Sequence, residues 1–163
     1  MKAALVIHSK TGTTLAFGKA IEQALQKEGI ETELFLLEFD SPHGEDPFSE
    51  EKDVILKDIP DCLPYDCILA GSPVWAFSPT PVIRAFLRKA KGLSGKRFYP
   101  FITMGLPFKG WGGTRALRAM ESIARTKGAV SFKGEAVMKR GRNLEKQMQS
   151  AAEGIAKRIK NNA

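Results

Sequence analysis

A short apolar run near the start of the chain ends abruptly in a cluster of small polar residues. The run covers 3–7, and the residues that follow are rich in hydroxyl groups, at Ser9, Thr11, Thr13 and Thr14. Apolar residues then return at the spacing of one helix face, at Phe17, Ala20, Ile21, Ala24 and Leu25. This order predicts a strand, a tight loop and the N-terminus of a helix.

The predicted loop at 9–14 has the features of an anion site. A helix N-terminus leaves backbone N–H groups unpaired at the positive end of the helix dipole, where they bind anions. The hydroxyls can donate to phosphate oxygens, and Gly12 allows a tight turn close to a ligand. Ser and Thr are also ordinary N-cap residues, but four hydroxyls around one glycine exceed what a cap requires. Neither a Walker A loop nor a G-x-G-x-x-G fingerprint occurs in the sequence.

The rest of the chain alternates between strand-like and helix-like segments. We predict strands at 2–8, 31–37, 65–71, 97–103 and 129–138, the last interrupted at 133–134. We predict helices at 14–27, from Pro81 behind a Thr80 cap, after Gly113, and at 143–160. This alternation predicts an α/β fold with a five-stranded parallel sheet in the order 2-1-3-4-5 and helices on both faces. We expect a single domain covering 1–163.

Two features fit this plan less well. Pro100 falls in the middle of the fourth strand, where proline cannot donate to the sheet, and implies a local bulge. The segment 38–61 is long for a connection, and we expect a short helix near 49–59 within it.

The net charge of +7 is unevenly distributed. Nine acidic residues and only two lysines lie between Glu38 and Asp61, so the remainder of the chain is strongly basic. A basic surface favours an acidic partner or an anionic nucleotide near the site, although an ordinary solvated surface explains it equally well. Nucleic acid is disfavoured as a partner because the basic residues are spread over several predicted helices with few aromatic residues between them.

Other classes of protein are excluded by what the sequence lacks. Its only cysteines, Cys62 and Cys67, cannot complete a zinc or iron–sulfur ligand set, so we expect no metal site. A disulfide across their short loop is one interpretation, and two reduced thiols, as is usual in cytosolic proteins, are the expected one. No apolar run approaches the roughly 18 residues of a membrane span. The residues 1–3 lead directly into a strand without a visible signal peptide. We therefore expect a cytoplasmic protein, and a homo-oligomer remains open.

Two more loops must lie at the same edge of the sheet as 9–14, because they also follow parallel strands. The loop at 72–81 carries Trp75 and Phe77 between prolines, and the loop at 103–113 combines Trp111 with several glycines. Aromatic faces and closely approaching backbone groups suit a planar ring. Core packing is the alternative for the aromatic side chains. The position of Trp75 and Phe77 beyond the predicted strand end favours the ligand or the surface, and Trp111 stays undecided.

These three loops resemble those of one known family. The sequence Ser-Lys-Thr-Gly-Thr-Thr at 9–14 is similar to the phosphate loop of flavodoxins. Gly-Ser-Pro-Val-Trp at 71–75, with the helix that follows it, resembles the second loop of flavodoxin-like FMN proteins, including NAD(P)H:quinone oxidoreductases. Thr-Met-Gly at 103–105, with the glycines at 112–113, resembles their third loop. The chain departs from the family at Thr13, where asparagine is common, at Ile7, where an aromatic residue is usual, and in its basic charge.

The resemblance implies a flavodoxin-like three-layer αβα sandwich with FMN bound non-covalently. It assigns the FMN phosphate to Ser9, Lys10, Thr11, Gly12, Thr13 and Thr14. It assigns the isoalloxazine ring to Pro73, Val74, Trp75, Ala76, Phe77, Thr103, Met104, Gly105, Gly110, Trp111, Gly112 and Gly113. No catalytic side chain is implied, because the flavin itself performs the redox chemistry. His8 is interpreted as structural.

Two functions of different class follow from this resemblance. The first is an electron-transfer flavodoxin that acts between redox partner proteins. The second is an enzyme that oxidises NAD(P)H and reduces a quinone or a similar acceptor. The carrier is placed first because no nicotinamide site can be identified in the sequence. A flavin-free anion-binding domain is a third interpretation, since fold does not determine function.

Overall fold

The computed structural model describes residues 1–42, 46, 48–105, 112–140 and 143–163. Its centre is a parallel sheet in the order β2-β1-β5-β7-β8, with β9 continuing beside β7 after β8. These strands are β1 (Lys2–Ile7), β2 (Glu31–Leu36), β5 (Cys67–Trp75), β7 (Arg97–Met104), β8 (Val130–Ser131) and β9 (Glu135–Met138). The predicted order 2-1-3-4-5 is confirmed, and the fifth strand is interrupted where the sequence indicated.

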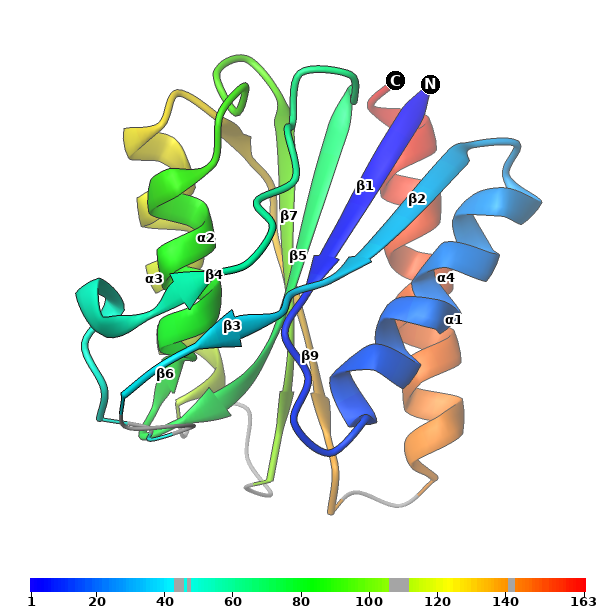
Figure 1. Cartoon of the computed structure of the whole chain (residues 1–163). Coiled ribbons are helices and arrows are strands. Elements are labelled where there is room, and N and C mark those ends of the chain that lie inside the picture. Colours follow the sequence, from blue (N-terminus) through cyan, green and yellow to red (C-terminus); the bar gives the residue numbers. More distant parts are fainter. Residues whose placement is uncertain (43–45, 47, 106–111, 141–142) are drawn as a thin grey trace.

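Two helices cover each face of the sheet, which makes a three-layer sandwich (Figure 1). The helices α1 (Thr13–Lys27) and α4 (Leu144–Asn161) lie together on one face, and α2 (Pro81–Lys89) and α3 (Gly113–Thr126) lie on the other. Alternate residues of each strand enter two separate cores, so Leu5 packs with Phe17 and Phe101 while Val6 packs with Phe86 and Ile102. The carboxyl ends of the parallel strands all meet at one edge of the sheet.

The local bulge that we expected at Pro100 is present, but it lies in the neighbouring strand. Between the pairs Phe98–Ser131 and Phe101–Glu135, β7 advances three residues and the β8–β9 strand advances four. β7 pairs with β5 in unbroken register through Ala70 and Pro100. On its other side, the carbonyl groups of Lys96, Phe98 and Met104 accept hydrogen bonds from the β8–β9 strand. Pro100 shares that orientation because successive residues of a strand alternate in direction. Its missing N–H therefore faces the gap between β8 and β9, where Gly134 lies against the Pro100 carbonyl.

The acidic segment forms less helix than predicted. It contains a two-stranded antiparallel ribbon of β3 (Phe39–Asp40) and β4 (Ile55–Leu56), with a single 3₁₀ turn, η1 (Glu51–Asp53), before β4. The expected helix near 49–59 is wrong beyond this turn because Ile55 and Leu56 pair in the ribbon, and one turn is too short to propagate a helix. β2 is an edge strand with one wetter face, as its imperfect alternation indicated.

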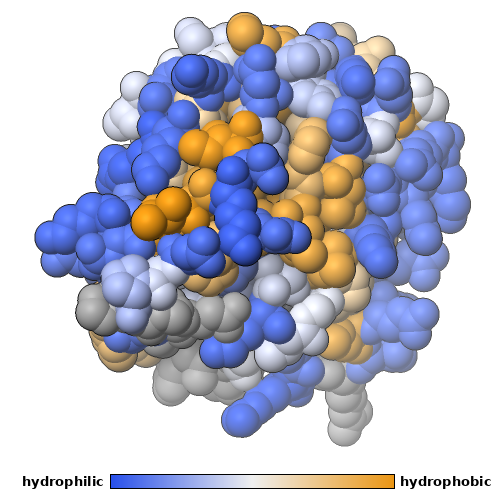
Figure 2. Space-filling view, in the orientation of Figure 1, coloured by the Kyte–Doolittle hydropathy of each residue, from blue (hydrophilic) through white to orange (hydrophobic). Residues whose placement is uncertain are grey.

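Figure 2 shows apolar side chains among charged ones on the face that carries β2, β3 and β4. Exposed apolar residues of this part of the chain include Leu36, Ile55 and Ile59. None of the helices among the described residues has the length and apolar character that a membrane span requires.

Both cysteines are free and buried in the structure. Burial raises the pKa of the Cys62 thiol to about 11 and that of Cys67 to about 12. Because only the thiolate reacts, we expect neither residue of the folded protein to react with Ellman's reagent near pH 8, and both to react at once in denaturant. Rapid labelling of the native protein would contradict this burial.

The same burial predicts a pH dependence of stability. The free energy of unfolding should fall as the pH rises above the unfolded thiol pKa of about 8.5, because there only the thiols of the unfolded chain ionise.

Candidate functional site

The first edge loop ends in a left-handed residue at the start of α1. Gly12 has φ +87° and is the N-cap of the helix. The Ala16 N–H donates to the Gly12 carbonyl at 2.9 Å, and the Leu15 N–H donates to Ser9 Oγ at 3.3 Å. Within the described residues this leaves the N–H groups of the first two helical positions, 13 and 14, for solvent or a ligand. The loop therefore has the backbone geometry of an anion-binding site.

The hydroxyls predicted to bind phosphate separate into two groups. Thr11 is exposed and Thr13 half-buried, and their Oγ1 atoms lie 3.4 Å apart. Thr14 is buried, and its Oγ1 lies 2.7 Å from Thr103 Oγ1 at the start of the third loop. Thr14 and Thr103 therefore join the first loop to the third. Ser9, whose Oγ accepts the Leu15 N–H, keeps an O–H group to donate, as do Thr11 and Thr13. Lys10 is exposed, with its Nζ 5.5 Å from the centre of the Trp75 ring.

The second loop is a tight hairpin rather than an open loop. β5 continues to Trp75 and pairs antiparallel with β6 (Ser78–Pro79), so Ala76 and Phe77 alone form the turn. Their φ angles of +47° and +60° are unusual for residues other than glycine, as a two-residue hairpin of this kind requires. Such strain persists where surrounding contacts hold it, and often marks a ligand site.

The aromatic side chains of this hairpin lie at its surface. Phe77 is 50% exposed, Trp75 and Val74 are half-buried, and Pro73 is buried. Our prediction placed Trp75 beyond the strand end, whereas it is the last residue of β5. The prediction that both rings face a ligand or the surface, and not the core, agrees with their exposure.

The third loop comes into contact with this hairpin. Gly112, with φ +102°, is the N-cap of α3, and a Cβ there would lie 2.7 Å from Phe77 Cδ1. Thr103 and Met104 are buried, and Gly105 is exposed. A hollow of about 120 Å³ separates the two loops and is lined by Val74, Ala76, Phe77, Met104 and Gly105. A Cβ on Gly113 would lie 2.8 Å from Met104 Sδ. The predicted ligand residues Gly110 and Trp111 lie outside the described residues.

A buried polar chain supports the base of the hairpin. His8 Nδ1 lies 2.8 Å from Thr80 Oγ1, and the Thr80 N–H donates to Ser72 Oγ at 3.0 Å. The Ile83 N–H donates to Thr80 Oγ1 at 3.4 Å, which confirms Thr80 as the N-cap of α2. The His8 ring contacts the edge of Trp75, with centroids 5.5 Å apart. These contacts agree with a structural role for His8.

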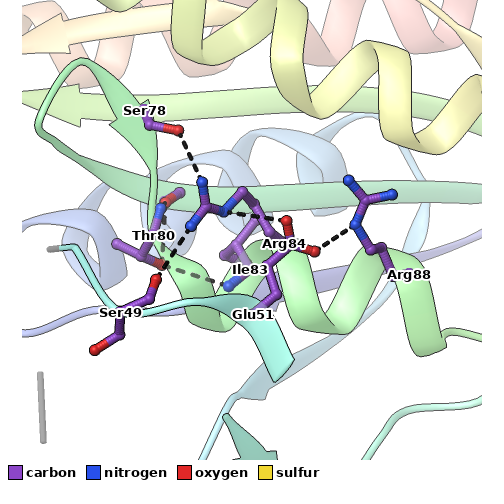
Figure 3. Close-up of polar contacts among 8 residues, drawn as sticks. Ser49, Glu51, Ser78, Thr80, Ile83, Arg84 and Arg88 are labelled. Atoms are coloured by element: carbon purple, nitrogen blue, oxygen red, sulfur yellow. Dashed lines mark hydrogen bonds and ion pairs between the residues drawn. The ribbon is translucent and has the colours of Figure 1, made fainter. Parts of the chain in front are cut away.

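An arginine that the sequence analysis did not identify ties the acidic segment to the hairpin (Figure 3). The Arg84 guanidinium donates to Ser78 Oγ at 3.4 Å and to the Ser49 carbonyl at 3.5 Å. Its Nε lies 3.6 Å from Glu51, which also pairs with Arg88 on the next turn of α2. Arg84 therefore holds η1 against β6, the second strand of the hairpin.

A lysine at the end of β9 was also missed. Lys139 Nζ donates to Thr11 Oγ1 at 2.8 Å, and the Lys139 backbone N–H donates to the Met104 carbonyl at 2.8 Å. No sequence motif connects residues 11 and 139, which are brought together only by the sheet order.

Larger hollows lie elsewhere on the molecule. A groove of about 760 Å³ runs between α1 and α4 and reaches Thr11 and Thr13 at one end. A second hollow, of about 460 Å³, lies between β9 and α4. Among the described residues there is no cluster of three or more His, Cys, Asp or Glu side chains that could hold a metal ion.

The sheet order, with two helices on each face, defines a flavodoxin-like α/β fold. No protein-family model matches the sequence, and no curated protein sequence matches it. Solved structures do match. A Streptococcus pneumoniae flavodoxin is 12% identical, with a TM-score of 0.69 over 100% of both chains. Flavodoxin 1 of Bacillus cereus is 18% identical, with a TM-score of 0.64 over 95% of this chain and 97% of its own.

A third solved structure is a flavoprotein of Lactobacillus acidophilus in complex with FMN. It is 20% identical, with a TM-score of 0.59 over 83% of this chain and 92% of its own. At these identities the three likenesses establish a flavodoxin-like fold.

Proposed function

We propose that this protein binds FMN non-covalently at the carboxyl edge of its sheet and acts as an electron carrier. The observation that carries the proposal is the meeting, at that edge, of the hydroxyl loop 9–14 with the aromatic hairpin 75–79. Flavodoxins and an FMN-bound flavoprotein are among the solved structures that share the fold, which supports the same ligand. Ligands of doubly wound sheets bind where the strand order reverses, here between β1 and β5.

The site offers hydrogen-bond donors for the phosphate end of FMN and an aromatic surface for its ring. Thr11, Thr13 and the helix N-terminus offer neutral donors, and Lys139 offers a charged one, to a phosphate. The hollow of about 120 Å³ is smaller than the roughly 300 Å³ of an ordinary ligand pocket, so it accepts only an edge of a flat ring. The remaining ring would lie against Trp75 and Phe77, with part of it exposed.

Each part of the chain has a separate task in this proposal. FMN, when bound, supplies the redox chemistry, and the protein supplies position and electrostatics. The loop at 9–14 holds the phosphate. The hairpin at 75–79 orients the ring, and Arg84 and His8 keep that hairpin in place. An exposed ring edge suits electron transfer to a partner protein without a closed active site.

Binding of FMN is the direct test. Titration of the apoprotein should quench FMN fluorescence to a 1:1 endpoint and raise the melting temperature. At an FMN concentration 100 times its Kd, linkage predicts about 2.7 kcal/mol of added stability. The absence of both quenching and stabilisation would reject the proposal.

The alternative function is that of an NAD(P)H-dependent reductase, and an assay of NAD(P)H oxidation distinguishes it from an electron carrier. Steady oxidation of NAD(P)H in the presence of a quinone would identify the enzyme and reject the carrier. The carrier predicts reduction by a redox partner protein and negligible NAD(P)H oxidation.

A further inference from the structure

Lys139 is held in place by hydrogen bonds from both its backbone and its side chain. Its backbone N–H donates to the Met104 carbonyl, at the end of the neighbouring strand β7, and its Nζ donates to Thr11 Oγ1, each at 2.8 Å. The residue is half-buried, between the first and third edge loops. Its ammonium group is therefore held beside the loop 9–14 before any ligand is present.

The charge of Lys139 is not neutralised by the protein. Within the part of the chain that the structure describes, no carboxylate forms an ion pair with it, whereas Lys160 and Lys52 pair with Glu28 and Glu50. Its contact is the neutral Thr11 hydroxyl, whose oxygen accepts a hydrogen bond from the ammonium group and which keeps its own O–H to donate. Thr13 Oγ1, at 3.4 Å, or a ligand oxygen can take that hydrogen bond. The arrangement presents a cation and a directed hydroxyl on one side of the loop.

The negative charge of a phosphate calls for more positive charge than the loop 9–14 alone supplies. A phosphate monoester carries about −1.5 to −2 charges at pH 7. The N-terminus of α1 supplies only about half a positive charge. An ammonium group adds a full charge and charge-assisted hydrogen bonds, which are roughly twice as strong as neutral ones. Riboflavin, which has the same ring without the phosphate, would gain nothing from Lys139.

We propose that Lys139 is a phosphate-binding residue of this site and makes it selective for FMN over riboflavin. The inference rests on the proposed function, since it concerns the phosphate of the same ligand. It adds to the hydroxyl loop a residue from the far end of the sequence.

The test compares Lys139→Met with Lys133→Met. Lys133 is exposed in the gap between β8 and β9, at the opposite end of β9, so the control variant makes the same change of charge away from the loop. Dissociation constants for FMN and riboflavin are measured by fluorescence quenching, and melting temperatures verify folding. Loss of a charged hydrogen bond predicts an FMN Kd raised about tenfold or more in Lys139→Met, with riboflavin changed less than about twofold. Lys133→Met should leave both constants unchanged.

Salt gives an independent readout. Raising the salt concentration should weaken FMN binding to the wild type more than to Lys139→Met, because screening acts on the charge that the variant lacks. Equal loss of FMN and riboflavin affinity, or unchanged FMN affinity, would overturn the role of Lys139 while the proposed function stands. Failure of the wild type to bind either flavin would instead overturn the proposed function.

Discussion

Replacing Gly71 with alanine is expected to lower the free energy of unfolding by about 2–3 kcal/mol. Gly71 is buried in β5 directly beside Phe101 of β7, and a Cβ there would lie 2.3 Å from Phe101 Cζ and 2.4 Å from its Cε2. Phe101 also packs edge-on against Phe17 of α1, with ring centroids 5.3 Å apart. The ring therefore has little room to retreat, and an extra methyl group must displace the strand or the helix.

The cause of this loss can be isolated by a compensating change. Phe101→Leu removes the ring atoms that the new methyl group would meet, at a cost of its own from the space that it leaves. The double variant should be markedly more stable than the sum of the two single changes predicts. Denaturant unfolding of the wild type and the three variants gives the coupling energy directly. Additive effects would show that the contact between Gly71 and Phe101 is not what limits this position.

The fold could be predicted because its signals are local. The apolar stretch at 65–71 indicated a buried central strand, Thr80 and Pro81 marked the start of α2, and 133–134 marked the break in the last strand. Each of these depends on hydrogen bonding or side-chain spacing within a few residues. The strand order followed from right-handed connections. The sequence indicated a bulge at Pro100 but not the strand that carries it, because the bulge lies in a partner strand some thirty residues away.

The site could be predicted only in outline, because its details depend on distant contacts. The hairpin at 75–79 was missed because Ala76 and Phe77 lack the Asn-Gly or Gly-Gly character typical of such turns. The Thr14 hydroxyl was assigned to phosphate from its neighbours in sequence, and nothing there indicates its contact with Thr103. Arg84 and Lys139 carry no local motif, and spatial proximity alone identifies them.

Replacing Gly112 with alanine should weaken FMN binding by roughly 100-fold, equivalent to about 2.7 kcal/mol. Two effects combine at this residue. Its φ of +102° is unfavourable for any residue with a Cβ, and the Cβ would lie 2.7 Å from Phe77 Cδ1 and 3.1 Å from Phe77 Cα. Because the second contact is with backbone, rotation of the Phe77 side chain cannot relieve it. The hairpin turn must move away from the third loop, and the proposed ring site is altered.

Gly29→Ala is the matched control, since Gly29 has φ +76° but no atom within 4 Å of a Cβ built there. Both variants should lose about 1–2 kcal/mol of stability from the left-handed backbone. Only Gly112→Ala should lose FMN affinity, as measured by fluorescence quenching at a temperature where both variants are folded. Equal FMN affinity in the two variants would mean that the contact between Phe77 and Gly112 does not shape the binding site. In that case the ring of the ligand must be held by other parts of the sheet edge, and the hairpin at 75–79 loses its proposed task.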